Sequence, residues 1–107
     1  MAYLFGSRAR GASHAASDVD LGILFQGGDA MRALDLAGTL ERATRVPVDV
    51  IDLEHASPDV IHRVLRDGIL LVERDKGRRV RFEVASRAAY LDLLPVLRRI
   101  RSARGAA

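Results

Sequence analysis

The chain has 107 residues, of which 49% are hydrophobic and 29% charged, so it can form one domain with a modest core. It contains no cysteine, which excludes disulfides, thiolate metal sites and a cysteine nucleophile. The net charge of +3 is uneven, with −4 over residues 1–73 and +7 over residues 74–107. Such a basic segment is typical of a solvated helix face, or of a protein that binds nucleic acid or an acidic protein surface. No apolar run approaches the roughly 20 residues of a membrane span, and the N-terminus does not resemble a signal peptide, so we expect a cytoplasmic protein.

The first half of the chain predicts two strands and a helix. An apolar run over residues 3–5 predicts a strand that ends in a tight turn, and alternating polarity over residues 18–25 predicts a second strand. Apolar residues spaced three to four apart over residues 30–44 predict a helix, with Asp29 as its N-cap. Pro47 ends this helical pattern.

The second half predicts two more strands, each followed by a helix. Residues 48–53 alternate like a strand, and a helix follows from Ser57, as N-cap, to about Arg66. The apolar run at residues 69–72 predicts a short buried strand. A long helix is expected over about residues 78–103, with a kink or a break at Pro95. The order of elements predicts one α/β domain with a mixed sheet. The apolar stripe of the last helix would consist of Phe82, Ala85, Ala89, Leu93, Val96 or Leu97, and Ile100.

Two short motifs carry the chemistry. Gly6 allows a backbone amide to approach a phosphate closely, and the hydroxyl of Ser7 can bind phosphate oxygens. Asp18 and Asp20 lie two apart on a predicted strand, so their carboxylates point to the same side, with Cα atoms roughly 6.5–7 Å apart. Paired carboxylates form a hard oxygen site that suits Mg²⁺. A metal held there could position a nucleoside triphosphate for attack at its α-phosphate.

A third carboxylate would complete a two-metal arrangement, with the ions about 3.5–4 Å apart. The strand at residues 48–53 offers Asp49 and Asp52, which lie three apart and therefore face opposite sides, so only one can join the site. Taken singly, each motif has a simpler reading: Gly-Ser is a common turn, and an Asp-x-Asp pair often marks the solvent-exposed side of a sheet. The combination of all three is far more specific.

Residues 6–11 (Gly-Ser-Arg-Ala-Arg-Gly) and 17–21 (Ser-Asp-Val-Asp-Leu) resemble the signature of the minimal nucleotidyltransferases, which belong to the DNA polymerase β-like superfamily. The resemblance is close over residues 4–25 and continues through residues 48–51. Residues 82–97 are similar to the C-terminal helix of MntA-type antitoxins, which are paired with HEPN-domain toxins. The resemblance implies a nucleotidyltransferase fold with a small mixed sheet and helices packed against it, in a single domain.

The resemblance also implies roles for individual residues. Gly6 and Ser7 would hold the triphosphate, and the aspartates would bind two Mg²⁺ ions. Asp49 is preferred to Asp52 because the family's third acid follows the first valine of this strand, and it would act as the base for the incoming hydroxyl. The nucleotide-binding residues would be Gly6, Ser7, Arg8 and Ser17, and the catalytic and metal-binding residues Asp18, Asp20 and Asp49.

By this resemblance, we expect an antitoxin that transfers AMP from ATP–Mg²⁺ to a tyrosine of a HEPN RNase toxin, within a hetero-oligomer, and so neutralises the toxin. Three alternatives remain: neutralisation by contact alone, transfer to a small molecule such as an aminoglycoside, and binding of nucleic acid by the basic C-terminal third. An aromatic content of only 5% argues against a nucleic-acid stacking surface. Paired acids favour the enzyme, because a binding protein needs no converging carboxylates. His55 and His62 lack metal-ligand spacing, and Tyr90 is expected in the core or at an interface.

Overall fold

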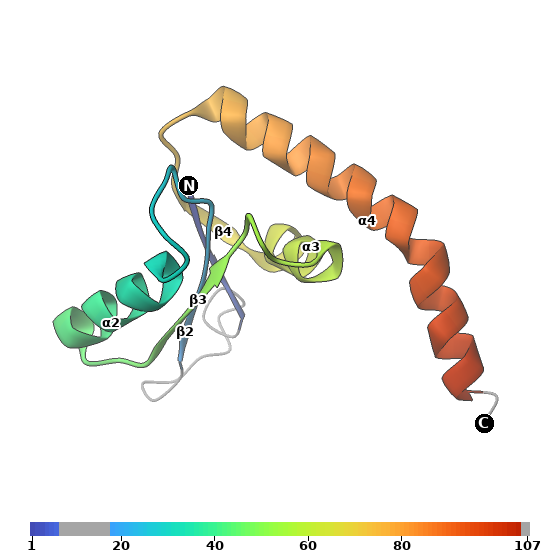
Figure 1. Ribbon diagram of the computed structural model, residues 1–107, viewed down its shortest axis with the longest axis horizontal. Coiled ribbons are helices and arrows are strands. Elements are labelled where there is room, and N and C mark those ends of the chain that lie inside the picture. The colour runs from blue at the N-terminus through green and yellow to red at the C-terminus, as the bar shows by residue number, and fades with distance from the viewer. Residues whose placement is uncertain (7–17, 106–107) are drawn as a thin grey trace.

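The computed structural model describes residues 1–6 and 18–105, in which a four-stranded sheet is flanked by helices (Figure 1). The predicted order of strands and helices is confirmed, with boundaries that differ by one to a few residues. The elements are β1 (Ala2–Phe5), β2 (Val19–Ile23), α2 (Arg32–Thr44), β3 (Val48–Asp52), α3 (Pro58–Asp67), β4 (Ile69–Val72) and α4 (Lys76–Gly105).

The sheet has the strand order β3-β2-β1-β4. β1 runs antiparallel to both of its neighbours, whereas β2 and β3 run parallel, so the predicted mixed sheet is confirmed. This arrangement brings the end of β1 to the beginnings of β2 and β3. Phe5 pairs with Asp20 across β1 and β2, and Asp20 pairs with Asp49 across β2 and β3. Three strands therefore deliver their candidate site residues to one edge of the sheet.

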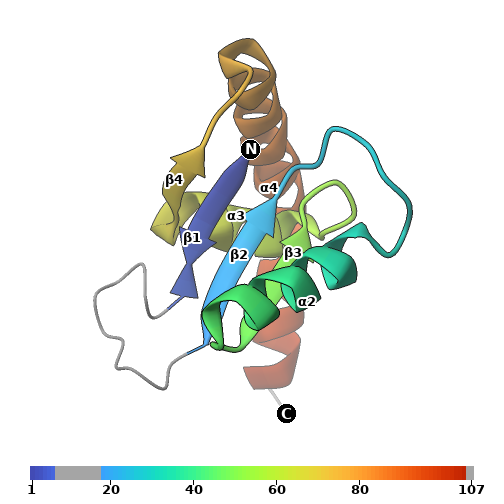
Figure 2. The ribbon, with the colours of Figure 1, turned by 90° about the vertical axis from the view of Figure 1, so that its left-hand side faces the viewer.

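The helices cover opposite faces of the sheet. Figure 2 shows α2 on one face and α3 on the other, with α4 packed against the outer side of α3. Each strand contributes side chains to both faces of the sheet, because successive side chains point to opposite sides. Leu21 and Val48 are buried on the side of α2, while the main core lies beneath α3. The buried members of that core are Tyr3, Leu24, Leu53, Ile61 and Val64.

Close contact between α3 and the sheet depends on Gly22. A Cβ atom at this position would lie 2.9 Å from Cγ1 of Val64 and 3.2 Å from Cδ2 of Leu53. Val64 and Leu53 are the most deeply buried side chains, with exposed fractions of 0% and 1%. The absence of a side chain at Gly22 therefore lets α3 pack directly over β2.

The first turns of α4 are attached to the sheet by polar contacts. The Tyr3 hydroxyl donates a hydrogen bond to Oε1 of Glu83 at 2.9 Å, and burial followed by this bond raises the pKa of Tyr3. Arg79 bridges Glu73 and Glu83 at 2.9 and 3.0 Å, and the Arg78 guanidinium donates to a backbone carbonyl at 2.8 Å. None of the helices in the described residues is long and apolar enough to cross a membrane.

Two expectations about burial and one about capping are wrong. Residues 69–72 form the predicted strand, but all four side chains are exposed, because β4 is an edge strand paired only with β1 among the described strands. The predicted stripe of α4 is only partly covered: Phe82 packs against the core, while Ala85, Ala89, Val96 and Ile100 are exposed.

Asp29 is not the N-cap of α2; its side chain accepts a hydrogen bond from the backbone N–H of Met31, before the helix begins.

The other capping and kink predictions have mixed outcomes. Ser57 is the N-cap residue of α3, but its hydroxyl bonds to the Asp59 carboxylate at 2.6 Å instead of capping the backbone. α4 continues through Pro95 without a break. The helix changes direction in its second half (Figure 1).

Candidate active site

The predicted aspartates converge at one edge of the sheet. Parallel pairing places Asp20 of β2 directly opposite Asp49 of β3, and residues opposite each other on adjacent strands point to the same side. Asp18 comes just before β2 and is exposed. Asp20 and Gly22, which share a face of β2, both lie on the side covered by α3. That face is therefore not simply the solvent-exposed side of the sheet.

Gly6 stands directly against Asp20 at the end of β1. Its φ of +74° lies in the left-handed region that glycine adopts without steric cost. A Cβ atom here would collide with Oδ2 of Asp20 and lie 3.2 Å from its Cγ. The absence of a side chain at Gly6 therefore leaves space for the Asp20 carboxylate at the end of β1.

A pocket of about 270 Å³ opens between this edge of the sheet and α3. The sheet contributes the glycine and both aspartates, and the helix contributes apolar and charged side chains. A pocket of mixed charge beside converging carboxylates is typical of a site for a charged ligand. Its lining residues are Phe5, Gly6, Asp20, Asp49, Ile51, Val60, Arg63, Arg66 and Asp67.

The electrostatics of the pocket favour a cation. Burial raises the pKa of Asp20, and the nearby negative charges of Asp49 and then Asp18 raise it further. A carboxylate in this setting is stabilised in its charged form by a positive ion placed between it and its neighbours. A divalent metal bound here would offset the repulsion between the carboxylates.

The donor set fits Mg²⁺ bound together with a phosphate. Among residues 1–6 and 18–105, no group of three or more histidine, aspartate or glutamate side chains forms a preorganised metal site. Mg²⁺ commonly binds through one or two carboxylates, with the remaining ligands supplied by water and by substrate phosphates. Asp20 and Asp49 provide such a pair, and Asp18 precedes Asp20 by two residues in the chain.

Asp52 lies outside this pocket. Its carboxylate accepts hydrogen bonds from Nε and Nη2 of Arg32, at 2.7 and 3.1 Å, and this pairing with α2 lowers the pKa of Asp52. Arg32 also pairs with Glu54. Of the two acids that the spacing of β3 left open, Asp49 is the one that shares a pocket with Asp20, because the two acids face opposite sides of the strand.

Three of the predicted nucleotide-binding residues, Ser7, Arg8 and Ser17, lie outside the described residues. The contribution of α3, in contrast, was not predicted. Val60, Arg63 and Asp67 recur at spacings of three and four on this helix, so they share the face that lines the pocket. That spacing was visible in the sequence, but only the packing of α3 across β2 shows that it faces the aspartates.

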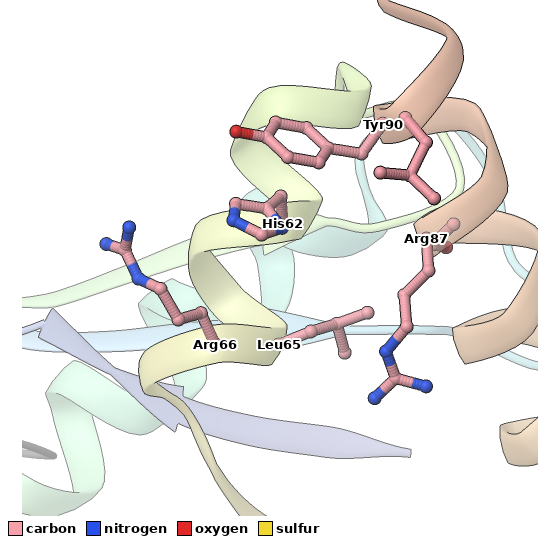
Figure 3. A pocket seen from close by; sticks show the side chains of 7 residues that line it. His62, Leu65, Arg66, Arg87 and Tyr90 are labelled. Carbon is pink, nitrogen blue, oxygen red and sulfur yellow. The ribbon is translucent and has the colours of Figure 1, made fainter. Parts of the chain in front are cut away.

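A second hollow lies on the outer side of α3, between α3 and α4. Its volume is about 370 Å³, and Figure 3 shows His62, Leu65 and Arg66 from α3 together with Arg87 and Tyr90 from α4. The rings of His62 and Tyr90 are stacked, with centroids 3.7 Å apart and planes inclined by 2°. Tyr90 therefore lies where α3 meets α4, and its stacking partner is His62, a histidine without metal-ligand spacing in the sequence.

The chain resembles known proteins in both sequence and fold. Residues 1–77 match the family described as polymerase β nucleotidyltransferase, while no curated protein matches the chain significantly. A toxin–antitoxin crystal structure with AMP-PNP aligns at 29% identity and a TM-score of 0.83, covering 94% of this chain and 82% of the other. The MntA–HepT toxin–antitoxin structure aligns at 26% identity and a TM-score of 0.75, covering 94% and 79%.

A third similar structure contains a tri-AMPylated HEPN toxin from Shewanella oneidensis in complex with its MNT antitoxin. It aligns at 26% identity and a TM-score of 0.75, covering 94% of this chain and 78% of the other. The family match spans most of the chain and includes all the strands and the aspartates that they carry. The chain therefore belongs to the polymerase β-type nucleotidyltransferase family and has the fold of the MntA antitoxins.

Proposed function

We propose that this chain is an antitoxin that transfers AMP from ATP–Mg²⁺ to a tyrosine of a cognate HEPN RNase toxin and thereby neutralises it. The observation that carries the proposal is the register of β2 and β3, which sets Asp20 beside Asp49, with Gly6 closing the site from β1. Two similar structures support the proposal: one is a tri-AMPylated HEPN toxin in complex with its MNT antitoxin, and the other is a toxin–antitoxin complex with AMP-PNP.

The chemistry follows from the residues of the pocket. The phenolic oxygen of the acceptor tyrosine attacks the α-phosphorus of ATP, an oxygen–phosphorus bond forms, and the bond to the bridging oxygen breaks to release pyrophosphate. By the family resemblance, Asp49, which lies opposite Asp20 on the neighbouring strand, receives the phenolic proton. Gly6 has no side chain to collide with the Asp20 carboxylate, and its backbone amide can approach the phosphates closely. Bound Mg²⁺ would supply charge neutralisation at the phosphates and polarise the α-phosphate.

The acceptor comes from another molecule. The described chain is a sheet with three helices, and its pocket is bounded by the sheet edge and α3. Several apolar side chains of α4 are exposed, including Val84 at 59% and Leu91 at 64%. Exposed apolar side chains on a long helix are typical of a surface that binds another protein. These residues suit the docking of a toxin in a hetero-oligomer.

The test uses the chain together with its HEPN toxin and ATP labelled at the α-phosphate. We expect label on the toxin and loss of RNase activity that requires ATP and Mg²⁺. Asp20→Asn should abolish both effects while the complex still forms, and Asp35→Asn, an exposed acid on α2, should behave like the unaltered chain. Inhibition of the RNase without ATP and without labelling would instead favour neutralisation by contact alone.

A further inference from the structure

The pocket contains a basic side chain that the proposed chemistry has not yet used. Arg63 projects from α3 into the same pocket as Gly6, Asp20 and Asp49. Among the described residues, it takes part in no hydrogen bond or ion pair. This is unusual for an arginine beside two carboxylates, since a guanidinium within reach of a carboxylate forms a paired hydrogen bond readily.

The other arginine of the pocket is already paired. Nε and Nη2 of Arg66 donate to the carboxylate of the adjacent Asp67 at 2.9 and 2.8 Å. Its donors are therefore partly occupied by a neighbour on the same helix. Arg63 differs because, within residues 1–6 and 18–105, none of its guanidinium donors forms a hydrogen bond, although its charge is close enough to Asp59 to help lower the pKa of that carboxyl.

The separation of charge across the pocket indicates what fills it. Asp20 and Asp49 stand on the sheet side and Arg63 on the helix side, and no ion pair joins them within 4.0 Å. A pocket of about 270 Å³ lies between. A metal-bound phosphate chain carries a cation toward the carboxylates and anionic oxygens toward the arginine, so it would complement both sides at once.

We propose that Arg63 is a phosphate-binding residue that contacts the triphosphate of the nucleotide from the side of α3. This inference rests on the proposed nucleotidyltransferase function and adds to Gly6 a second, cationic contact from the helix side of the pocket. The planar guanidinium can donate two parallel hydrogen bonds to one phosphate group, which a lysine cannot do. Arg63 would hold the phosphates in place and offset their charge beside the two aspartates.

The test measures ligand binding by the purified chain in the presence of Mg²⁺, with ATP and inorganic tripolyphosphate as probes. Arg63→Gln should weaken both ligands by the same factor, about 10- to 100-fold, as expected for loss of a charge-assisted contact. Arg63→Lys keeps the charge but loses the paired donors. Its affinity for both ligands should lie between that of the unaltered chain and that of Arg63→Gln. Arg99→Gln removes an equally exposed arginine from α4 and should bind like the unaltered chain.

The controls separate this inference from the proposed function. The midpoint of urea unfolding should stay nearly the same in Arg63→Gln, because the side chain is exposed and forms no ion pair with the part of the chain that the structure describes. Unchanged ATP affinity in this variant, or a loss for ATP without a loss for tripolyphosphate, would overturn the role of Arg63 and leave the proposed function standing. A chain that binds no ATP even when unaltered would overturn both.

Discussion

Replacing Gly6 by alanine perturbs the site far more than the fold. The residue has a φ of +74°, and its new Cβ atom would collide with Oδ2 of Asp20. A left-handed conformation costs an L-residue about 1–2 kcal/mol. That cost is small against the roughly 5–15 kcal/mol that stabilises a typical domain, so the variant should remain folded. The collision, in contrast, should displace the Asp20 carboxylate from its present position.

The expected effect on activity is therefore large. Displacement of a catalytic group by about 1 Å can reduce the rate roughly 100-fold, so Gly6→Ala should transfer AMP at about 1% of the original rate or less. The matched control is Gly22→Ala, in which the new Cβ atom would lie 2.9 Å from Cγ1 of Val64. Overpacking of this kind costs about 1–3 kcal/mol, but it occurs under α3 and not at the aspartates.

The two variants are compared by urea unfolding and by transfer of labelled AMP to the toxin. The account predicts similar losses of stability and a selective loss of transfer in Gly6→Ala. Full transfer by a folded Gly6→Ala variant would refute the reasoning, because it would show that the carboxylate does not need the space that glycine leaves. Equal losses of transfer in both variants would show that stability, not site geometry, limits activity.

Three further predictions concern other parts of the molecule. Asp49→Asn should fold normally and transfer no AMP, whereas Asp52→Asn should stay largely active, and the labelled-ATP assay distinguishes them; the reverse result would exchange the roles of the two acids. Because pairing with Arg32 lowers the pKa of Asp52, the unaltered chain should exceed Asp52→Asn in stability above the unfolded carboxyl pKa of about 4, and this advantage should shrink as pH falls through the lower folded pKa. An advantage that instead grew toward low pH in urea titrations would contradict the ion pair. Leu53 is 1% exposed, so Leu53→Ala should lower the free energy of unfolding by about 2–5 kcal/mol. Leu71 is 53% exposed, so Leu71→Ala should change it by no more than about 0.5 kcal/mol. A similar loss in both variants would show that β4 is covered.

The order of elements could be predicted because local signals mark it clearly. Alternation at Val48–Asp52 and the proline that begins α3 depend only on neighbouring residues. The paired aspartates were also visible, because period-two geometry determines which side chains share a face of one strand. These are properties of short segments, and tertiary packing left them unchanged.

Local patterns do not determine which strands are covered or which side chains share a pocket, because both depend on tertiary packing. A run of four apolar residues at Ile69–Val72 fits a strand covered on both faces, and also an exposed edge strand such as β4. The choice between Asp49 and Asp52 depends on which face of β3 meets α3, and the pairing of Asp52 with Arg32 joins segments 20 residues apart. The roles of Arg63 and His62 likewise depend on how α3 crosses the sheet and meets α4.

The central claim is that Gly6, Asp20 and Asp49 form the pocket that holds a metal-bound nucleotide. The most direct measurement is a crystal structure of the chain grown with Mn²⁺ and a non-hydrolysable ATP analogue, in which anomalous scattering locates the metal. The account predicts Mn²⁺ between the carboxylates of Asp20 and Asp49, with the phosphates passing between Gly6 and α3. Nucleotide bound elsewhere, with no metal at these two carboxylates, would contradict it.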